Sequence, residues 1–271
     1  MDTATAISLV CIAVLYVAGL RRLWTSDGGR LTITRWRAIA FFVGWLAAAV
    51  ALVGPLDRLS DVLFSAHMGQ HELLMLVAAP LMVLGRPFIA MLWSSPRPAR
   101  SVVAAIARHR AWSFLTGPFT VLVLHAVVLW MWHVPSLFEA ALHSELIHAV
   151  QHLAFFITAA LFWFALLHGR YGKLGYGVGV LYVFATMMHT QILGALLTFG
   201  SRIWYPTHAA RTAAAGVNPI DDQQFAGILM WIPFGLVFLF IVLALFAAWL
   251  GEAERRVAFT TSERLARESR G

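Results

Sequence analysis

Seven stretches of about 20 residues with almost no charged side chain dominate this chain. An α-helix of about 20 apolar residues is long enough to cross the roughly 30 Å hydrocarbon core of a bilayer. The strands of a membrane β-barrel would alternate between apolar and polar residues. The chain is 60% hydrophobic and 12% charged, against roughly 25% charged in a soluble domain. The sequence therefore predicts an all-α, polytopic membrane helical bundle of about seven transmembrane helices, not a soluble globular protein.

The breaks between apolar stretches divide residues 1–271 into spans within a single membrane domain. The spans are expected near 4–20, 36–54, 62–84, 114–132, 144–167, 177–199 and 224–250. The loops at 95–112 and 200–223 are long enough for short interfacial helices, and 251–271 reads as a cytoplasmic, solvated helical tail. Because Asp2 precedes the first span and Arg21 and Arg22 follow it, that span is expected to be an uncleaved helix rather than a signal peptide.

The basic residues predict the orientation. With the N-terminus outside, 17 of the 20 Lys and Arg residues fall on the inner side and 3 on the outer side: Arg58, Arg202 and Arg211. Such an excess marks the cytoplasmic side, so the C-terminus is expected in the cytoplasm of a multi-pass bacterial inner-membrane protein. The same topology accounts for the pI near 10.5, and membrane lipid, not nucleic acid, is the expected surrounding.

Two spans repeat one polar pentad. His67-x-x-Gln70-His71 and His148-x-x-Gln151-His152 lie at similar depths in helices that both start from the outer side. Histidines four residues apart lie on one face of a helix, so each pair can point at a common site. The prediction is that both pairs line one polar site near the outer membrane face.

The depth of the histidines suggests two levels. At 1.5 Å rise per residue, the deeper level would contain His71, His125, His152 and His189, and the shallower one His67, His133 and His148, with Asp221 and Asp222 at the outer rim. Ionisable groups within a membrane cost a few kcal/mol and usually mark function, although a lone histidine can serve only as an interhelical hydrogen bonder. His109, His143 and His208 are expected to be solvated.

The available ligands favour copper. Imidazole suits Zn, Cu, Fe and Ni, and one cysteine, Cys11, cannot form a thiolate site. Met75, one turn below His71, would suit Cu(I), but methionine is more often apolar filler. Copper is the predicted metal ion, as Cu(I) or Cu(II). The role of Glu72 is open, and Asp222 could hydrogen-bond a ligand histidine or cap its own helix.

Spacing alone leaves other classes open. The histidines could line a transporter or a proton or metal channel, bind haem between facing helices, or hold non-haem iron. A scaffold that binds no metal also fits the sequence.

Four runs of sequence, in order, resemble the bacterial seven-helix cytochrome c oxidase assembly factors, a family distinct from the single-span copper chaperone. The runs are HMGQHELLMLVAAPLMVLG from His67, HAVVLWMWHVPSLFEAAL from His125, IHAVQHLAFFITAALFW from Ile147 and DDQQFAGILMWIPFG from Asp221. The resemblance covers about residues 35–250.

This resemblance implies a non-enzymatic factor that matures a haem-copper oxidase and delivers copper to it. Its partners would be cytochrome c oxidase subunits and other copper chaperones. The residues carried over as metal ligands are His67, His71, His125, His133, His148, His152 and Asp222. Two departures concern the surroundings of the ligands: Glu72 stands where an apolar residue is expected, and Gln151 where a glutamate is expected.

Overall fold

The computed structural model describes residues 3–26, 32–168 and 176–268, with the backbone alone at 97 and 257–268. Within these ranges the chain forms helices and no strands, which confirms the predicted all-α class. Five helices are each long and apolar enough to cross a membrane: α1 (Thr3–Trp24), α3 (Arg35–Val53), α12 (Glu145–His168), α14 (Tyr176–Thr198) and α16 (Pro219–Glu268).

Two bent pairs of helices raise the number of candidate spans among the described residues to as many as seven, if each pair is one span. The first joins α5 (Phe64–Glu72), the π-helix η1 (Leu73–Ala78) and α6 (Ala79–Leu84) to α7 (Pro87–Ser94), with a 56° bend. The second joins α10 (Pro118–Trp132) to α11 (Pro135–His143), with a 71° bend. Pro87 and Pro135 account for the two breaks, because a proline disfavours helical backbone in the residue before it. Within the span expected near 114–132, α10 begins at Pro118.

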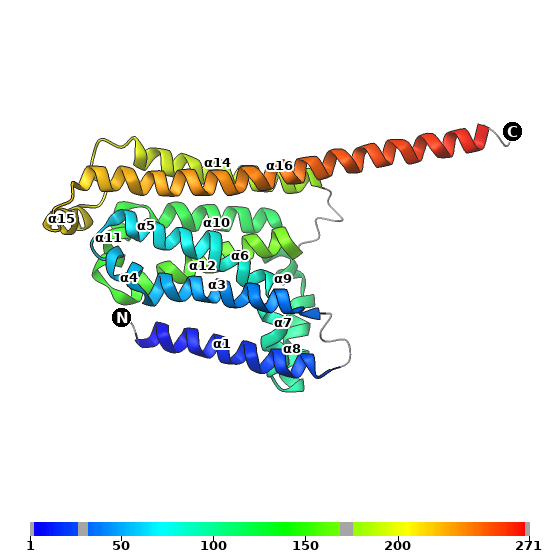
Figure 1. The fold of residues 1–271 in the computed structure, drawn as a ribbon, viewed down its shortest axis with the longest axis horizontal. Helices are drawn as coiled ribbons and strands as arrows, with labels where there is room; N and C mark the ends of the chain where they lie inside the picture. The colour runs from blue at the N-terminus through cyan, green and yellow to red at the C-terminus, as the bar shows by residue number, and fades with distance from the viewer. Residues whose placement is uncertain (1–2, 27–31, 169–175, 269–271) are drawn as a thin grey trace.

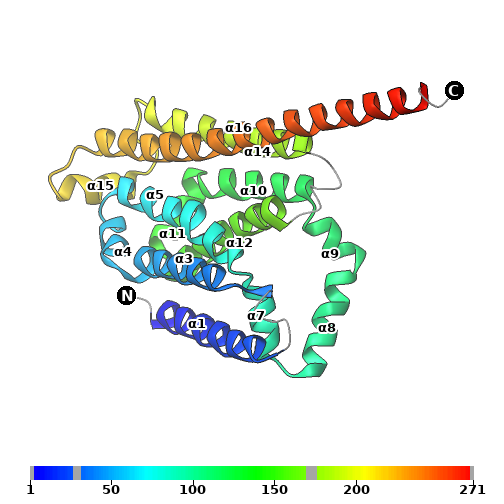
Figure 2. The same cartoon turned by 45° about the vertical axis from the view of Figure 1, so that its right-hand side comes forward.

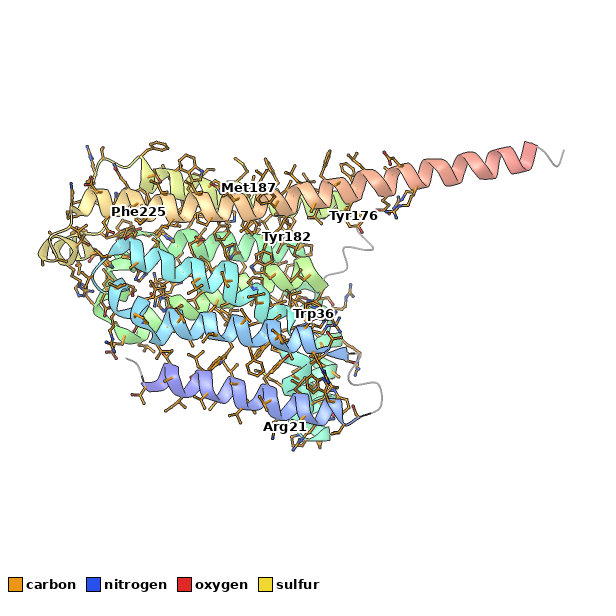
Figure 3. The ribbon with its side chains drawn as sticks, viewed as in Figure 1. Arg21, Trp36, Tyr176, Tyr182, Met187 and Phe225 are labelled. Carbon is orange, nitrogen blue, oxygen red and sulfur yellow. The ribbon has the colours of Figure 1, made fainter. Side chains whose placement is uncertain are left out.

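Short helices cover both ends of the bundle. α4 (Pro55–Ser60), α11 and α15 (Pro206–Ala214) lie at the end where the N-terminus is, and α7, α8 (Arg97–Arg108) and α9 (Arg110–Leu115) lie at the other (Figures 1 and 2). α16 runs past that second end toward the C-terminus. Arg21 and Tyr176 also lie near the second end, and Phe225 near the first (Figure 3). Arg170 and Lys173, counted on the inner side, fall outside the described residues.

Close helix contacts depend on small residues. A Cβ on Gly19 of α1 would lie 1.7 Å from the carbonyl oxygen of Ala90 in α7, and a Cβ on Gly227 of α16 would lie 2.8 Å from that of Gly194 in α14. Packing through small residues is typical of helices in lipid. Many large apolar side chains, including Phe119 and Leu181, remain exposed on the bundle's sides, as expected for surfaces that face lipid.

The π-helix follows directly after His71 and Glu72. The N–H of Ala79 donates to the carbonyl of Leu74, five residues back. In this register the N–H of residue 80 would donate to the Met75 carbonyl. Residue 80 is a proline and has no N–H. The Met75 carbonyl instead accepts a 2.8 Å hydrogen bond from the indole Nε1 of Trp163. This bond ties the helix of His71 to α12, which carries His152.

Candidate metal centre

The two pentads occupy equivalent places in their helices. His67 is the fourth residue of α5, and His148 is the fourth residue of α12. Both helices begin at the end of the bundle covered by α4, α11 and α15 (Figure 1). The helical repeat then places His71 and His152 one turn deeper, on the same faces as His67 and His148.

The four pentad histidines come together as a four-histidine cluster. The ring centres of His67 and His71 are 4.5 Å apart and those of His148 and His152 are 4.2 Å apart. Between the helices, His67 and His148 are separated by 5.4 Å and His71 and His152 by 5.1 Å. Ligand atoms of His67, His71 and His152 all lie within 4.8 Å of one another.

The cluster leaves buried nitrogen atoms without a protein partner. Among the described residues these are His71 Nδ1 and Nε2, and Nε2 of His67, His148 and His152. A buried polar atom without a hydrogen bond costs about 1–3 kcal/mol. An ion bound by imidazoles would compensate, and the ring centres of two imidazoles on one ion lie about 5–6 Å apart, given metal–nitrogen bonds of about 2 Å. The donor set is all nitrogen, which suits copper among other transition metals.

His208 adds a fifth imidazole, and the prediction that it is solvated was wrong. Its exposed fraction is 1%, since α15 packs it against Phe64 and within 5.8 Å of the His67 ring centre. Burial, and secondarily the nearby Arg211 guanidinium, lower the pKa of His208 below its ordinary value, although Asp222, Asp61 and the Ser60 backbone oppose the shift. Thr212, four residues later on the same face of α15, is buried as well, and no local sequence pattern predicts this burial. His109 and His143 are exposed as expected.

A pocket of about 430 Å³ leads to the cluster from the covered end of the bundle. It is lined by Ser60, Asp61, His67, Ala141, Leu142, His143, Ser144, Glu145, His148 and Arg211. Arg211 spans it, with hydrogen bonds of 3.3 Å to the Asp61 carbonyl and 3.4 Å to the Leu142 carbonyl. The pocket therefore reaches the two shallower histidines, His67 and His148, and not the deeper pair directly.

His125 and His133 lie outside the cluster. Among the described residues, the ring contacts of His125 are with Phe162 and with His189, at 5.9 Å. The expected common level of four imidazoles is thus two separate pairs, because depth along a helix does not determine which neighbour a side chain faces. His133 bonds the Leu129 carbonyl of its own helix through Nδ1 at 2.7 Å. The Phe155 ring contacts both His133 and His71.

Among the described residues, the hydrogen bonds of Asp222 match neither the bond to a histidine nor the cap of its own helix that the sequence suggested. Its carboxylate accepts hydrogen bonds from the backbone N–H groups of Phe64 and Ser65, from the Ser65 hydroxyl and from Thr212 Oγ1 at 3.4 Å. It therefore caps α5, the helix of His67 and His71. Its own helix α16 is capped by Asn218, whose side chain accepts from the Ile220 N–H.

The remaining polar residues of the pentads differ from one another. Gln70 donates to the Ala51 carbonyl at 2.7 Å and to Asp57 at 3.3 Å. Gln151 is fully buried, and neither of its amide atoms has a partner among the described residues. Glu72 is buried with Oε2 unpartnered, and Met75 is buried. The local repeat therefore does not extend to the surroundings of the four histidines.

Comparisons with known proteins place the whole chain, not the site alone, among similar sequences. Residues 14–252 match the family model for the cytochrome c oxidase caa3 assembly factor (Caa3_CtaG). Uncharacterized proteins of Mycobacterium bovis and Mycobacterium tuberculosis are each 26% identical to this chain, over 95% of it and 40% of their own length. An uncharacterized protein of Mycobacterium leprae is 23% identical, over 94% of this chain and 40% of its own length. The chain spans about two fifths of the length of these relatives, and no solved structure matches it.

Proposed function

The chain belongs to the cytochrome c oxidase caa3 assembly factor family, and from that premise we propose that it binds copper as cargo at the four-histidine cluster and delivers it to the oxidase. The family match confirms the resemblance indicated by the motifs. The observation that carries the copper proposal is the set of buried, unpartnered imidazole nitrogens on two facing helices. No turnover reaction is proposed, because transfer of an ion needs binding and release alone.

The two depths of histidine suggest an order of events. His67 and His148 line the pocket and would receive copper first. His71 and His152, one turn deeper, would complete the ligand set. Exchange among imidazoles lets an ion be held tightly yet pass on without breaking all its bonds at once.

We assign the cluster to the outer side of a bacterial inner membrane. Arg21 and Arg22 at the end of α1, and Arg35 and Arg37 at the start of α3, lie at the opposite end of the bundle, and such residues favour the cytoplasmic side. The N-terminus would then be outside and the C-terminus inside. On the outer side the pocket would face an oxidase copper subunit or a chaperone that brings copper.

Copper binding is tested by elemental analysis and an absorbance spectrum of the chain purified in mild detergent under reducing conditions. We expect copper in the native chain, a marked loss in His71→Ala/His152→Ala, and no loss in the matched control His143→Ala, since His143 is exposed beside the same pocket. A haem band, or iron in place of copper, would replace the proposal by a redox protein. No metal would leave a scaffold or a channel.

Delivery is tested in cells. A strain without this protein should lose cytochrome c oxidase activity while its total copper stays normal. The native gene and His143→Ala should restore the activity, and His71→Ala/His152→Ala should not. Restoration by the double variant would show that oxidase assembly does not need the cluster.

A further inference from the structure

A second pair of histidines lies within the bundle, apart from the four-histidine cluster. His125 belongs to α10 and His189 to α14, and their ring centres are 5.9 Å apart. His125 is 2% exposed. Both residues lie within candidate membrane spans, where an ionisable side chain is costly unless it has a partner.

The hydrogen bonds of Thr158 favour one tautomer of His125. The hydroxyl of Thr158 donates to backbone carbonyls of its own helix, at 2.9 Å from Ala154 and 3.2 Å from Phe155, which leaves its oxygen to accept from the imidazole. His125 Nδ1 lies 3.3 Å from that oxygen and therefore carries the proton. The Nε2 lone pair is then free to bind a metal ion, and a hydrogen bond to the other ring nitrogen typically orients a metal-binding histidine.

His189 lacks any such bond. Both of its ring nitrogens are buried without a hydrogen-bond partner among the described residues. The neighbouring Thr190 donates its hydroxyl to carbonyls of α14. Since a neutral imidazole has one donor and one acceptor, the free acceptor of His189 and that of His125 can serve the same cation.

We propose that His125 and His189 form a second metal site, which binds one Cu(I) ion between two imidazoles. Two imidazoles in line on one ion place their ring centres about 6 Å apart, because each metal–nitrogen bond is about 2 Å long. The observed 5.9 Å fits this arrangement. Among the described residues, no third His, Cys, Asp or Glu joins His125 and His189 in a group of possible metal ligands. The pair therefore offers a low-coordinate site with nitrogen ligands, which suits Cu(I) and not ions that demand four or more ligands.

The identity of the ion rests on the proposed function, but the site uses no residue of the cluster, so the two can fail separately. Cu(I) is titrated into the purified full-length chain against a colorimetric Cu(I) chelator. The variants are His189→Phe, the cluster variant His71→Ala/His152→Ala, and their combination. Thermal unfolding of each metal-free protein checks that it remains folded.

We expect two Cu(I) per native chain, one in each of the two separate variants and none in the combination. X-ray absorption of the cluster variant should show two nitrogen neighbours. Copper in the native chain that disappears entirely in the cluster variant would overturn the second site and leave the proposed function intact. A single copper in the native chain that remains in the cluster variant and is lost in His189→Phe would overturn the proposed function of the cluster and leave the second site intact.

Thr158→Val supplies a test that keeps the shape of the core. It removes the hydroxyl that orients His125, so Cu(I) affinity at the pair should fall by about 10- to 100-fold. The copper of the cluster should be unaffected. An unchanged affinity in a cluster variant that also carries Thr158→Val would contradict the assignment of His125 as a ligand.

Discussion

The carboxylate of Asp222 accepts a 2.7 Å hydrogen bond from the backbone N–H of Phe64, a residue 158 positions earlier in the chain. The start of α16 thereby caps the start of α5. His67 lies three residues after Phe64, so this long-range cap fixes the depth and rotation of the first cluster histidine. Thr212 of α15 contributes to the same carboxylate, which connects the helix that carries His208 to the site.

Asp222→Ala should destabilise the protein and weaken the cluster. Loss of a helix cap costs about 0.5–2 kcal/mol, and here the loss also leaves the buried N–H groups of Phe64 and Ser65 without an acceptor. The measurements are thermal unfolding in detergent and copper content. Asp221→Ala is the matched control, because Asp221 is the adjacent carboxylate and is exposed. Equal effects of the two variants would mean that the cap does not position the cluster.

Trp163→Phe should lower stability by about 1–3 kcal/mol, because it leaves the Met75 carbonyl buried without a donor. The indole is the donor observed there, and phenylalanine keeps most of the aromatic packing. Thermal unfolding gives the effect, with Trp249→Phe as the control since Trp249 is exposed on α16. A similar loss in both variants would point to packing and not to the hydrogen bond.

The same hydrogen bond should be coupled to Pro80. In Pro80→Ala the new N–H can serve the Met75 carbonyl or restore α-helical register, so Trp163→Phe should cost less in that background. A double-mutant cycle of unfolding free energies measures the difference. If the two substitutions changed the unfolding free energy by strictly additive amounts, Pro80 would not be the reason that the Met75 carbonyl lacks a backbone donor.

The pentad histidines could be grouped from sequence because their geometry is local. A spacing of four within one helix determines that His67 and His71 share a face, and the repeat in a parallel helix suggested the second half of the site. The positions of His208 and Asp222 depend on how α15 and α16 pack against α5, and no local pattern encodes this. The separation of His125 from the cluster also depends on how each helix is rotated about its own axis. The apolar sequence of a helix that faces lipid does not predict this rotation.

Arg211→Gln should speed copper exchange at the cluster, given the proposed function. The guanidinium spans the pocket with two long hydrogen bonds, and its charge repels an approaching cation. Loading and removal rates, measured by mixing with a Cu(I) chelator, should both rise, with less than about 1 kcal/mol change in stability. Arg202→Gln is the control, since Arg202 is exposed and lines a different pocket. Unchanged rates would indicate that copper does not enter past Arg211.

Asp57→Asn should stabilise the metal-free protein at neutral pH. Partial burial, followed by repulsion from Asp61, raises the pKa of Asp57 above its ordinary value of 3.8, while the hydrogen bond from Gln70 and the nearby His148 oppose the shift. The folded state therefore holds a proton more readily than the unfolded chain does. This contribution to stability is complete below pH 3.8 and is lost as the pH rises through the raised pKa. At pH 7 the charge is a net cost, which asparagine removes while it keeps the acceptor for Gln70.

The gain in unfolding free energy at pH 7 should be less than about 1 kcal/mol, because Asp57 is only half-buried and solvent screens it. Unfolding measured in a pH series should show the difference between Asp57→Asn and the native chain shrinking as the pH falls toward 3.8. Asp221→Asn, an exposed carboxylate at the same end of the bundle, controls for the removal of one negative charge. A gain that stayed constant down to low pH would assign the effect of Asp57 to packing and not to its charge.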